Sequence, residues 1–153
     1  MTVRTQITTT SPEGTADLGR RFAATLTAGD VVLVSGRLGA GKTVFVAGVA
    51  EGLGVSEPVT SPSFVLARSY RDGFLPLVHA DVYRLRTVAE FEDLDLVAEA
   101  EDGVLIVEWG EAVEGAVPHD HLVVRFTTTE ADTRRIEFEP HGSWETRDLG
   151  MLS

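Results

Sequence analysis

The sequence predicts a mixed α/β fold, in which a mostly parallel central sheet has helices on both faces and added antiparallel hairpin strands. Three observations predict it. Two short apolar runs, at 31–35 and 104–111, are typical of strands buried on both faces of a parallel sheet. The first run leads through a glycine-rich loop into a helical segment. Two further pairs of extended runs flank turn signals, which indicates antiparallel hairpins.

The composition is typical of one globular domain. The chain has 153 residues, of which 43% are apolar and 24% charged, so we expect residues 1–153 to form a single domain. Cysteine is absent, which excludes disulfides and thiolate metal sites. The sequence shows neither the apolar run of a signal peptide nor the roughly 20 apolar residues that cross a bilayer. We therefore expect a cytoplasmic protein without a membrane partner.

The charge is strongly acidic. Asp and Glu number 24 and Lys and Arg 13, for a net charge of −11. Proteins that hold nucleic acid directly usually present a basic face that displaces counterions from the phosphates. We therefore expect no direct, tight binding to RNA or DNA, and any link to nucleic acid would run through a partner.

Helical signals flank the glycine loop. Ser11 is a good capping residue and Pro12 tolerates the first helical position, and apolar residues then recur at helical spacing, which predicts a helix from Pro12 to about Leu26. After the loop, "TVFVAGVAEGLG" predicts a second helix that is closed by Gly52 or Gly54.

The second half of the chain mixes hairpins with one helix. The stretch "FVLARSYRDGFLPLVHADVY" has extended runs on both sides of Asp72-Gly73, a strong hairpin signal. Thr87 and Glu90 form a capping box that opens a helix through "AEFEDLDLVAEA". After Pro118, "HLVVRFTTT" and "RRIEFEP" alternate around "EADT" as another hairpin. The C-terminal tail carries little pattern.

The loop "GRLGAGKT", Gly36–Thr43, satisfies G-x-x-x-x-G-K-[ST] after a buried strand and before a helix. Its glycines allow a concave backbone whose N–H groups point at phosphate oxygens, and the helix adds its positive end. Lys42 is the only lysine of the chain. A compact ammonium suits a phosphate nest as a point charge, whereas a guanidinium is bulkier and prefers a bidentate fork. Thr43 offers a hydroxyl to Mg²⁺.

Carboxylates follow two of the predicted strands. Glu108 ends the buried run "VLIVE", where such a site needs an oxygen ligand for Mg²⁺, directly or through water. In "HADVYRL", Asp81 and His79 share one face of an extended run. Asp81 fits two roles: acting on a metal-bound or attacking water, or capping and pairing with Arg84. His79 fits a hydrogen-bonded structural role better than a catalytic one.

The stretch "TSPSF", residues 60–64, is stiffened by proline and follows the loop helix. Loops that sense the γ-phosphate lie at such positions in nucleotide-dependent switches, and Ser61 and Ser63 carry suitable hydroxyls. A plain connecting loop fits the sequence equally well. Trp109 follows Glu108 and is either close enough to report bound nucleotide or part of the core.

Together, "GRLGAGKT", "TSPSF", "HADVYRL" and "VLIVEWGE" resemble, in this order and spacing, the bacterial TsaE (YjeE) family of small P-loop ATPases. The similarity runs from about residue 10 to residue 142. It implies a P-loop NTPase-like three-layer sandwich that binds ATP and Mg²⁺ and hydrolyses ATP weakly. It also implies action with the TsaD and TsaB proteins, which place threonylcarbamoyl on the adenosine beside the anticodon of tRNAs that read codons starting with A.

The resemblance also implies roles for single residues. Lys42, Asp81 and Glu108 would be catalytic, Thr43 and Glu108 would bind Mg²⁺, and the switch loop would include Ser61 and Ser63. The chain departs from the family at two positions. Arg37 stands where the family usually has an acidic residue, which alters the charge near the phosphates or the partner surface. Ser63 stands where the family usually has Thr, and this change keeps the hydroxyl. The implied nucleotide-binding residues are Gly36, Gly39, Ala40, Gly41, Lys42, Thr43 and Val44, with Ser11 and Thr15 near the base.

Other nucleotide-dependent functions also use a glycine loop of this kind. A GTPase needs an Asn-Lys-x-Asp guanine reader, which a chain without asparagine or a second lysine cannot contain. A small-molecule kinase would use the same nest and Mg²⁺ but needs an arginine-rich lid, for which Arg84 and Arg86 are the nearest candidates. A nucleotide-gated binder without hydrolysis remains a third alternative.

Overall fold

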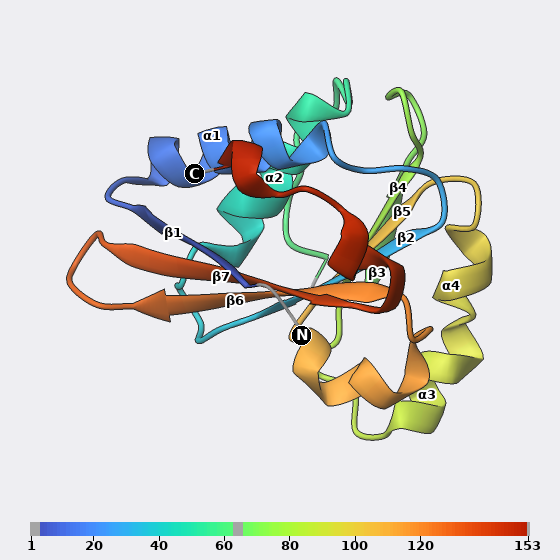
Figure 1. Cartoon of the computed structure of the whole chain (residues 1–153). Helices are drawn as coiled ribbons and strands as arrows, with labels where there is room; N and C mark the ends of the chain where they lie inside the picture. The colour runs from blue at the N-terminus through green and yellow to red at the C-terminus, as the bar shows by residue number, and fades with distance from the viewer. Residues whose placement is uncertain (1–3, 63–65, 153) are drawn as a thin grey trace.

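The computed structural model describes residues 4–62 and 66–152 and contains one seven-stranded sheet with helices on both faces (Figure 1). The strand order is β1-β7-β6-β2-β5-β4-β3. The predicted α/β architecture is therefore confirmed. The strands are β1 (Thr5–Thr9), β2 (Asp30–Ser35), β3 (Ala67–Tyr70), β4 (Leu77–Asp81), β5 (Val104–Glu108), β6 (His121–Thr128) and β7 (Arg134–His141).

The four central strands β6, β2, β5 and β4 are parallel. Every residue of β2, β4 and β5 is buried. The apolar runs of β2 and β5 predict this burial, whereas the sequence predicts β4 only as a strand of the first hairpin. Successive side chains of β2 enter opposite cores, because a strand alternates its faces: Val32 and Val34 lie in one apolar cluster, Val31 and Leu33 in the other. All four strands end at the same edge of the sheet.

Antiparallel strands extend the sheet on both sides. β3 pairs with β4, and β7 pairs with β6, as both hairpin signals predict. The connection of the first hairpin is longer than a two-residue turn at Asp72-Gly73. The last paired residues are Tyr70 and Leu77, so residues 71–76 all belong to the connection. Phe74 in that connection donates its backbone N–H to Leu53. β1, which the sequence did not indicate, adds a further antiparallel edge against β7.

Two helices, α1 (Pro12–Ala23) and α2 (Lys42–Gly52), cover one face of the sheet (Figure 1). They pack at very short range through glycine: a Cβ at Gly19 would lie 2.3 Å from the carbonyl oxygen of Phe45. The predicted Ser11 cap is present, since its hydroxyl accepts from the N–H of Gly14 at 3.0 Å. α1 ends three residues before the predicted Leu26, and the remaining residues form turns.

The other face carries α3 (Val88–Leu94), α4 (Leu96–Glu99) and the 3₁₀ segment η1 (Gly110–Ala116) (Figure 1). The capping box is confirmed, because the Thr87 hydroxyl accepts from the N–H of Glu90 at 3.2 Å. The continuous helix predicted through "AEFEDLDLVAEA" is wrong. Asp95 has a φ of 53°, a left-handed conformation that ends one helix and begins the next.

The C-terminal tail forms two 3₁₀ segments, η2 (Gly142–Thr146) and η3 (Gly150–Leu152). Its Trp144 and Leu152 are fully buried and belong to the core cluster beneath α1. The tail therefore covers part of the core despite its weak sequence pattern. Among the helices of the described residues, none combines the length and the apolar character needed to cross a bilayer.

Candidate functional site

The glycine loop and the two predicted carboxylates meet at the carboxyl edge of the central sheet. β2 leads into the loop at Gly36, while β4 and β5 end at Asp81 and Glu108. Glu108 pairs in register with Val34 on one side and with Asp81 on the other. Ligands bind at this edge of open parallel sheets, where the strand connections diverge to opposite faces.

Backbone conformations that favour glycine shape the loop. Gly36, Gly39 and Gly41 have φ angles of 145°, 80° and 99°. Gly36 is also confined, because an added Cβ would lie 2.9 Å from the Cβ and the carbonyl oxygen of Phe126. Gly41 caps α2 without a side chain, so the first turn of the helix opens toward the cavity beside the loop.

Lys42 is buried at the first position of α2, with 5% of its surface exposed. Its ammonium donates to the carbonyl oxygens of Gly36 and Arg37 and lies 3.9 Å from the centre of the Trp109 ring. Burial lowers the pKa of Lys42, although the negative charges of Glu108, Glu111 and Asp81 act in the opposite direction. An anion bound at the loop would compensate this buried charge.

A chain of hydrogen bonds runs from Thr43 into the core. The Thr43 hydroxyl lies 3.1 Å from both carboxylate oxygens of Glu108. The same carboxylate accepts from Nε2 of His79 at 2.5 Å, and both side chains are almost completely buried. His79 therefore has the hydrogen-bonded structural position that the sequence favours, and this position orients a predicted metal ligand.

Asp81 has partners on two sides. One carboxylate oxygen accepts from the backbone N–H of Tyr83 at 2.9 Å, and the other accepts from the hydroxyl of Ser61 at 3.3 Å. The first contact is a capping interaction, and the second links the residue to the proline-containing loop. Ser63, the other predicted switch residue, lies outside the described residues. Arg37 is exposed on the loop.

Three cavities flank the loop, of which the largest, about 720 Å³, is an open one beside Gly36, Arg37 and Trp109. One of about 330 Å³ is open to Lys42, Thr43 and both predicted carboxylates. Its lining comprises Leu38, Gly39, Ala40, Gly41, Lys42, Thr43, Val44, Ser61, Asp81, Glu108 and Trp109. A smaller one of about 140 Å³ is lined by Ser11, Pro12, Thr15, Gly39, Gly41, Val44, Asp132 and Arg134. The predicted base-side residues Ser11 and Thr15 are therefore close to the loop, on the side of α1.

The hydroxyls of Ser11 and Thr15 already have protein partners. Ser11 caps α1, and Thr15 shares a 2.7 Å hydrogen bond with Thr9. Sequence reasoning missed Arg134, whose guanidinium donates to the carbonyl oxygens of Ala40 at 3.0 Å and Gly39 at 3.3 Å. No local motif marks it, because its contact with the loop joins residues more than ninety positions apart.

The donor set fits a magnesium ion and phosphates. Thr43 and Glu108 supply a hydroxyl and a carboxylate side by side, which are hard oxygen ligands of the kind that Mg²⁺ prefers. The ammonium of Lys42, the amino end of α2 and the glycine backbone suit phosphate oxygens. The residues present therefore fit a magnesium–nucleotide complex.

Comparison with known proteins agrees with this arrangement. The family model described as "Threonylcarbamoyl adenosine biosynthesis protein TsaE" matches residues 9–136. The tRNA threonylcarbamoyladenosine biosynthesis protein TsaE of Streptomyces coelicolor is 46% identical over 146 residues, which cover 90% of this chain and 98% of that protein. The Bacillus subtilis protein of the same name is 40% identical over 135 residues, with coverages of 88% and 85%.

A solved structure gives the same result. The crystal structure of Bacillus subtilis YdiB has a TM-score of 0.80 to this chain at 34% sequence identity, and the match covers 99% of this chain and 93% of that one. Sequence and fold thus agree over nearly the whole chain. The chain belongs to the TsaE family of threonylcarbamoyl adenosine biosynthesis proteins.

Proposed function

We propose that the chain binds ATP with Mg²⁺ at the glycine loop, hydrolyses it slowly, and thereby serves tRNA threonylcarbamoyladenosine synthesis. One observation carries the nucleotide part: the Thr43 hydroxyl and the Glu108 carboxylate lie side by side, next to the buried ammonium of Lys42. This combination of oxygen ligands and a buried cation suits a metal-bound phosphate chain. The names of the similar proteins support the pathway.

Each group of the site has a role in this proposal. The backbone N–H groups of the loop and Lys42 hold the phosphates, and Lys42 exchanges its carbonyl partners for phosphate oxygens. Mg²⁺, when bound, neutralises charge on the phosphate oxygens. Asp81, which also accepts from Ser61, orients the attacking water or accepts its proton. His79 holds the Glu108 carboxylate in position from the core.

The smaller cavity would take the base side of the nucleotide. Because the hydroxyls of Ser11 and Thr15 are engaged within the protein, they contribute surface rather than free hydrogen-bonding groups. Val44, which is partly exposed, adds an apolar contact at the start of α2. Arg134 fixes the carbonyl groups of the loop on the same side.

In this proposal, ATP binding and hydrolysis act as a switch that controls docking of the chain to the TsaD and TsaB proteins. ATP can shift a docking equilibrium only through contacts that differ between nucleotide states. The link between Ser61 and Asp81 supports such a difference, since a γ-phosphate beside Asp81 would compete for the same groups. Binding to a TsaD–TsaB complex should therefore differ in affinity with ATP, with ADP and without nucleotide. Equal affinities in all three states would exclude the switch.

Nucleoside mass spectrometry of tRNA tests the pathway. Cells whose only copy carries Lys42→Ala should lose threonylcarbamoyladenosine while the protein remains folded and present. Arg68→Ala is the matched control, because Arg68 is an exposed cation on β3, away from the loop. Retained modification with Lys42→Ala would remove the assigned role and favour the alternative of a small-molecule kinase.

Phosphate release tests hydrolysis separately. The purified chain should release phosphate slowly from ATP, and Asp81→Asn should reduce the rate more than the affinity for ATP, because Asp81 acts on the water in this proposal. If the chain binds ATP but releases no phosphate with or without TsaD and TsaB, it is a nucleotide-gated binder and not an ATPase.

A further inference from the structure

Arg134 holds two peptide groups of the glycine loop from a distant strand. It is the first residue of β7, and it lines the cavity of about 140 Å³ beside the loop. Its Nε donates to the carbonyl oxygen of Ala40 at 3.0 Å, and its Nη2 donates to that of Gly39 at 3.3 Å. A planar guanidinium presents its donors in a fixed fork, so one side chain sets the direction of both carbonyl groups.

The direction of a carbonyl group also sets the direction of the next N–H group, because the two point in opposite directions across a planar trans peptide. The carbonyl of Ala40 points at Arg134, so the N–H of Gly41 points away from it. The N–H behind the Gly39 carbonyl, that of Ala40, donates to the carbonyl oxygen of Arg37 at 3.0 Å. Among the residues that the structure describes, the N–H of Gly41 has no such acceptor. It is therefore available to a phosphate oxygen.

The positive charge of Arg134 also lies beside the loop. Its Nη1 donates to the carbonyl oxygens of Ala131 and Thr133, in the connection between β6 and β7. Within the described part of the chain, no carboxylate forms an ion pair with this guanidinium, although Asp132 lines the same cavity. A cation held by carbonyl groups keeps its full charge. In a chain with a net charge of −11, it makes the potential at the loop more favourable to an anion.

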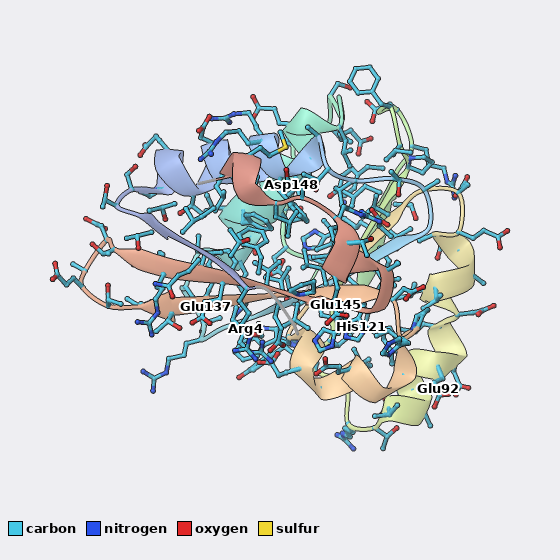
Figure 2. All side chains as sticks on the ribbon, viewed as in Figure 1. Arg4, Glu92, His121, Glu137, Glu145 and Asp148 are labelled. Carbon is cyan, nitrogen blue, oxygen red and sulfur yellow. The ribbon has the colours of Figure 1, made fainter. Side chains whose placement is uncertain are left out.

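The neighbouring Arg135 has none of these contacts. Successive side chains of a strand point to opposite faces, so Arg135 lies on the other face of β7. Its Nε is 3.7 Å from the carboxylate of Glu137, which lies on the face of β7 turned away from α1 (Figure 2). It lines neither the cavity beside Arg134 nor the one beside Lys42. Two adjacent arginines therefore differ in their contact with the loop.

We propose that Arg134 is a positioning residue for phosphate binding. It fixes the carbonyl groups of Gly39 and Ala40, which directs the N–H of Gly41 to the phosphates, and it adds a positive charge beside them. The inference rests on the proposed nucleotide function and deepens it, because it makes the affinity of the loop depend on a residue outside the glycine motif. Since Nη1 holds the β6–β7 connection, the loop and that connection form one unit.

Titration calorimetry with ATP and Mg²⁺ tests the contribution to affinity. Arg134→Ala should weaken binding at least about tenfold, because it removes two charge-assisted hydrogen bonds to the loop and the charge. Arg134→Lys should weaken it by roughly three- to fivefold, because lysine keeps the charge but lacks the fork. This variant also fills most of the same space, so it provides the test if the alanine variant does not fold. Arg135→Ala is the matched control and should bind ATP like the wild type.

Inorganic tripolyphosphate with Mg²⁺ separates the phosphate side from the base side, because it has no base. Arg134→Ala should weaken its binding by the same factor as that of ATP. A loss confined to ATP would place the contribution of Arg134 at the base and overturn the proposal. Wild-type affinity for ATP in Arg134→Ala and Arg134→Lys would also overturn it, while leaving the proposed function intact. Failure of the wild type to bind ATP would instead remove the proposed function, and this inference with it.

Amide NMR spectra of the nucleotide-free protein test the positioning directly. The signals of Ala40 and Gly41 should shift or broaden in Arg134→Ala and less so in Arg134→Lys, whereas those of the buried strand β2 should remain. A merely structural role would lower the melting temperature of Arg134→Ala without this local change and without partial rescue by lysine. An unchanged Gly41 signal in Arg134→Ala would show that another contact directs this N–H group, and would overturn the proposal.

Discussion

His79 and Glu108 share a 2.5 Å hydrogen bond in the core, where their side chains are 0% and 3% exposed. The contact joins two neighbouring parallel strands just below the glycine loop. Nδ1 of His79 is buried without a partner among the described residues. A buried imidazole with one nitrogen unpaired is costly, and the hydrogen bond that holds the Glu108 carboxylate in position offsets part of this cost.

His79→Ala should lower the free energy of unfolding by about 2–4 kcal/mol, because it leaves a buried carboxylate with one partner fewer. His79→Gln should lose less, since its amide can donate to the same oxygen. Urea denaturation gives both values. His119→Ala, at an exposed position, should change stability by no more than about 0.5 kcal/mol. Equal losses for the alanine and glutamine variants would show that packing, and not the hydrogen bond, matters at residue 79.

Lys42→Met should abolish nucleotide binding while raising the free energy of unfolding at neutral pH, on the order of 1 kcal/mol. Burial lowers the pKa of Lys42, so the folded chain holds this proton less tightly than the unfolded chain. The charged ammonium is therefore a net cost of folding, and methionine of similar length removes it. Chemical denaturation of both proteins measures the difference, with Arg68→Met as the exposed control.

The difference in the free energy of unfolding between the wild type and Lys42→Met should depend on pH with a definite sign. Between the lowered folded pKa and the ordinary lysine value of about 10.4, the unfolded chain binds more protons, so wild-type stability rises with pH. The advantage of Lys42→Met should shrink over that alkaline range. A Lys42→Met protein that is less stable than the wild type at neutral pH would show that the carbonyl contacts outweigh the buried charge.

Gly36→Ala should destabilise the protein by about 2–4 kcal/mol and reduce nucleotide affinity. The residue has a φ of 145°, and the new Cβ would lie 2.9 Å from Phe126. Gly115→Ala is the matched control, because an added Cβ there meets nothing within 4 Å. Thermal melts and ATP titrations of the two variants check the prediction. Wild-type affinity in Gly36→Ala would mean that the loop does not need this backbone shape.

Glu139→Gln should lower stability at neutral pH by on the order of 1 kcal/mol. Burial raises the pKa of Glu139, but hydrogen bonds from Arg125 and His141 and the charges of Arg125 and Arg4 outweigh it, so the net pKa is lowered. The carboxyl group of Glu139 therefore binds its proton more tightly in the unfolded chain than in the folded chain. The stabilisation is full above the ordinary glutamate value of about 4.3 and is lost as pH falls through the lowered folded pKa.

Urea melts of the wild type and of Glu139→Gln across the acidic range measure this stabilisation. The two proteins should converge in stability as the pH falls, since the wild-type carboxylate becomes protonated and loses its ion pairs. A gap that stays constant with pH would mean that the loss comes from packing rather than from charge.

The features that the sequence predicts well are local ones. The glycine loop, the buried strands around it and the caps at Ser11 and Thr87 depend on residues close together in the chain, so their patterns can be interpreted without tertiary information. Glu108 could be located because it ends a buried strand that had to lie in a parallel sheet.

The features that the sequence did not reveal depend on contacts between distant residues. β1 has mostly polar, half-exposed residues and becomes a strand only because β7 offers an edge to pair with. Arg134 reaches the loop from a hairpin that is far away in sequence. Trp144 belongs to the core because the tail folds back toward α1, although the apolar residues around it in the sequence have no helical or strand spacing. Tertiary packing overrides local propensity in each case.

Trp109 fluorescence should report nucleotide binding. The Lys42 ammonium lies 3.9 Å from its ring centre, and the Tyr83 ring lies 4.8 Å away, so movement of Lys42 toward phosphate oxygens changes the surroundings of the indole. As ATP with Mg²⁺ is added, the emission of the wild type should change until the binding site is saturated.

The chain has two tryptophans, and Trp144 is buried in the core beneath α1. Trp109→Phe should therefore lose the response. Lys42→Ala keeps both tryptophans and should lose it too, which separates loss of binding from loss of the reporter. A full response from Trp109→Phe would assign the signal to Trp144 and imply that nucleotide binding reaches the core.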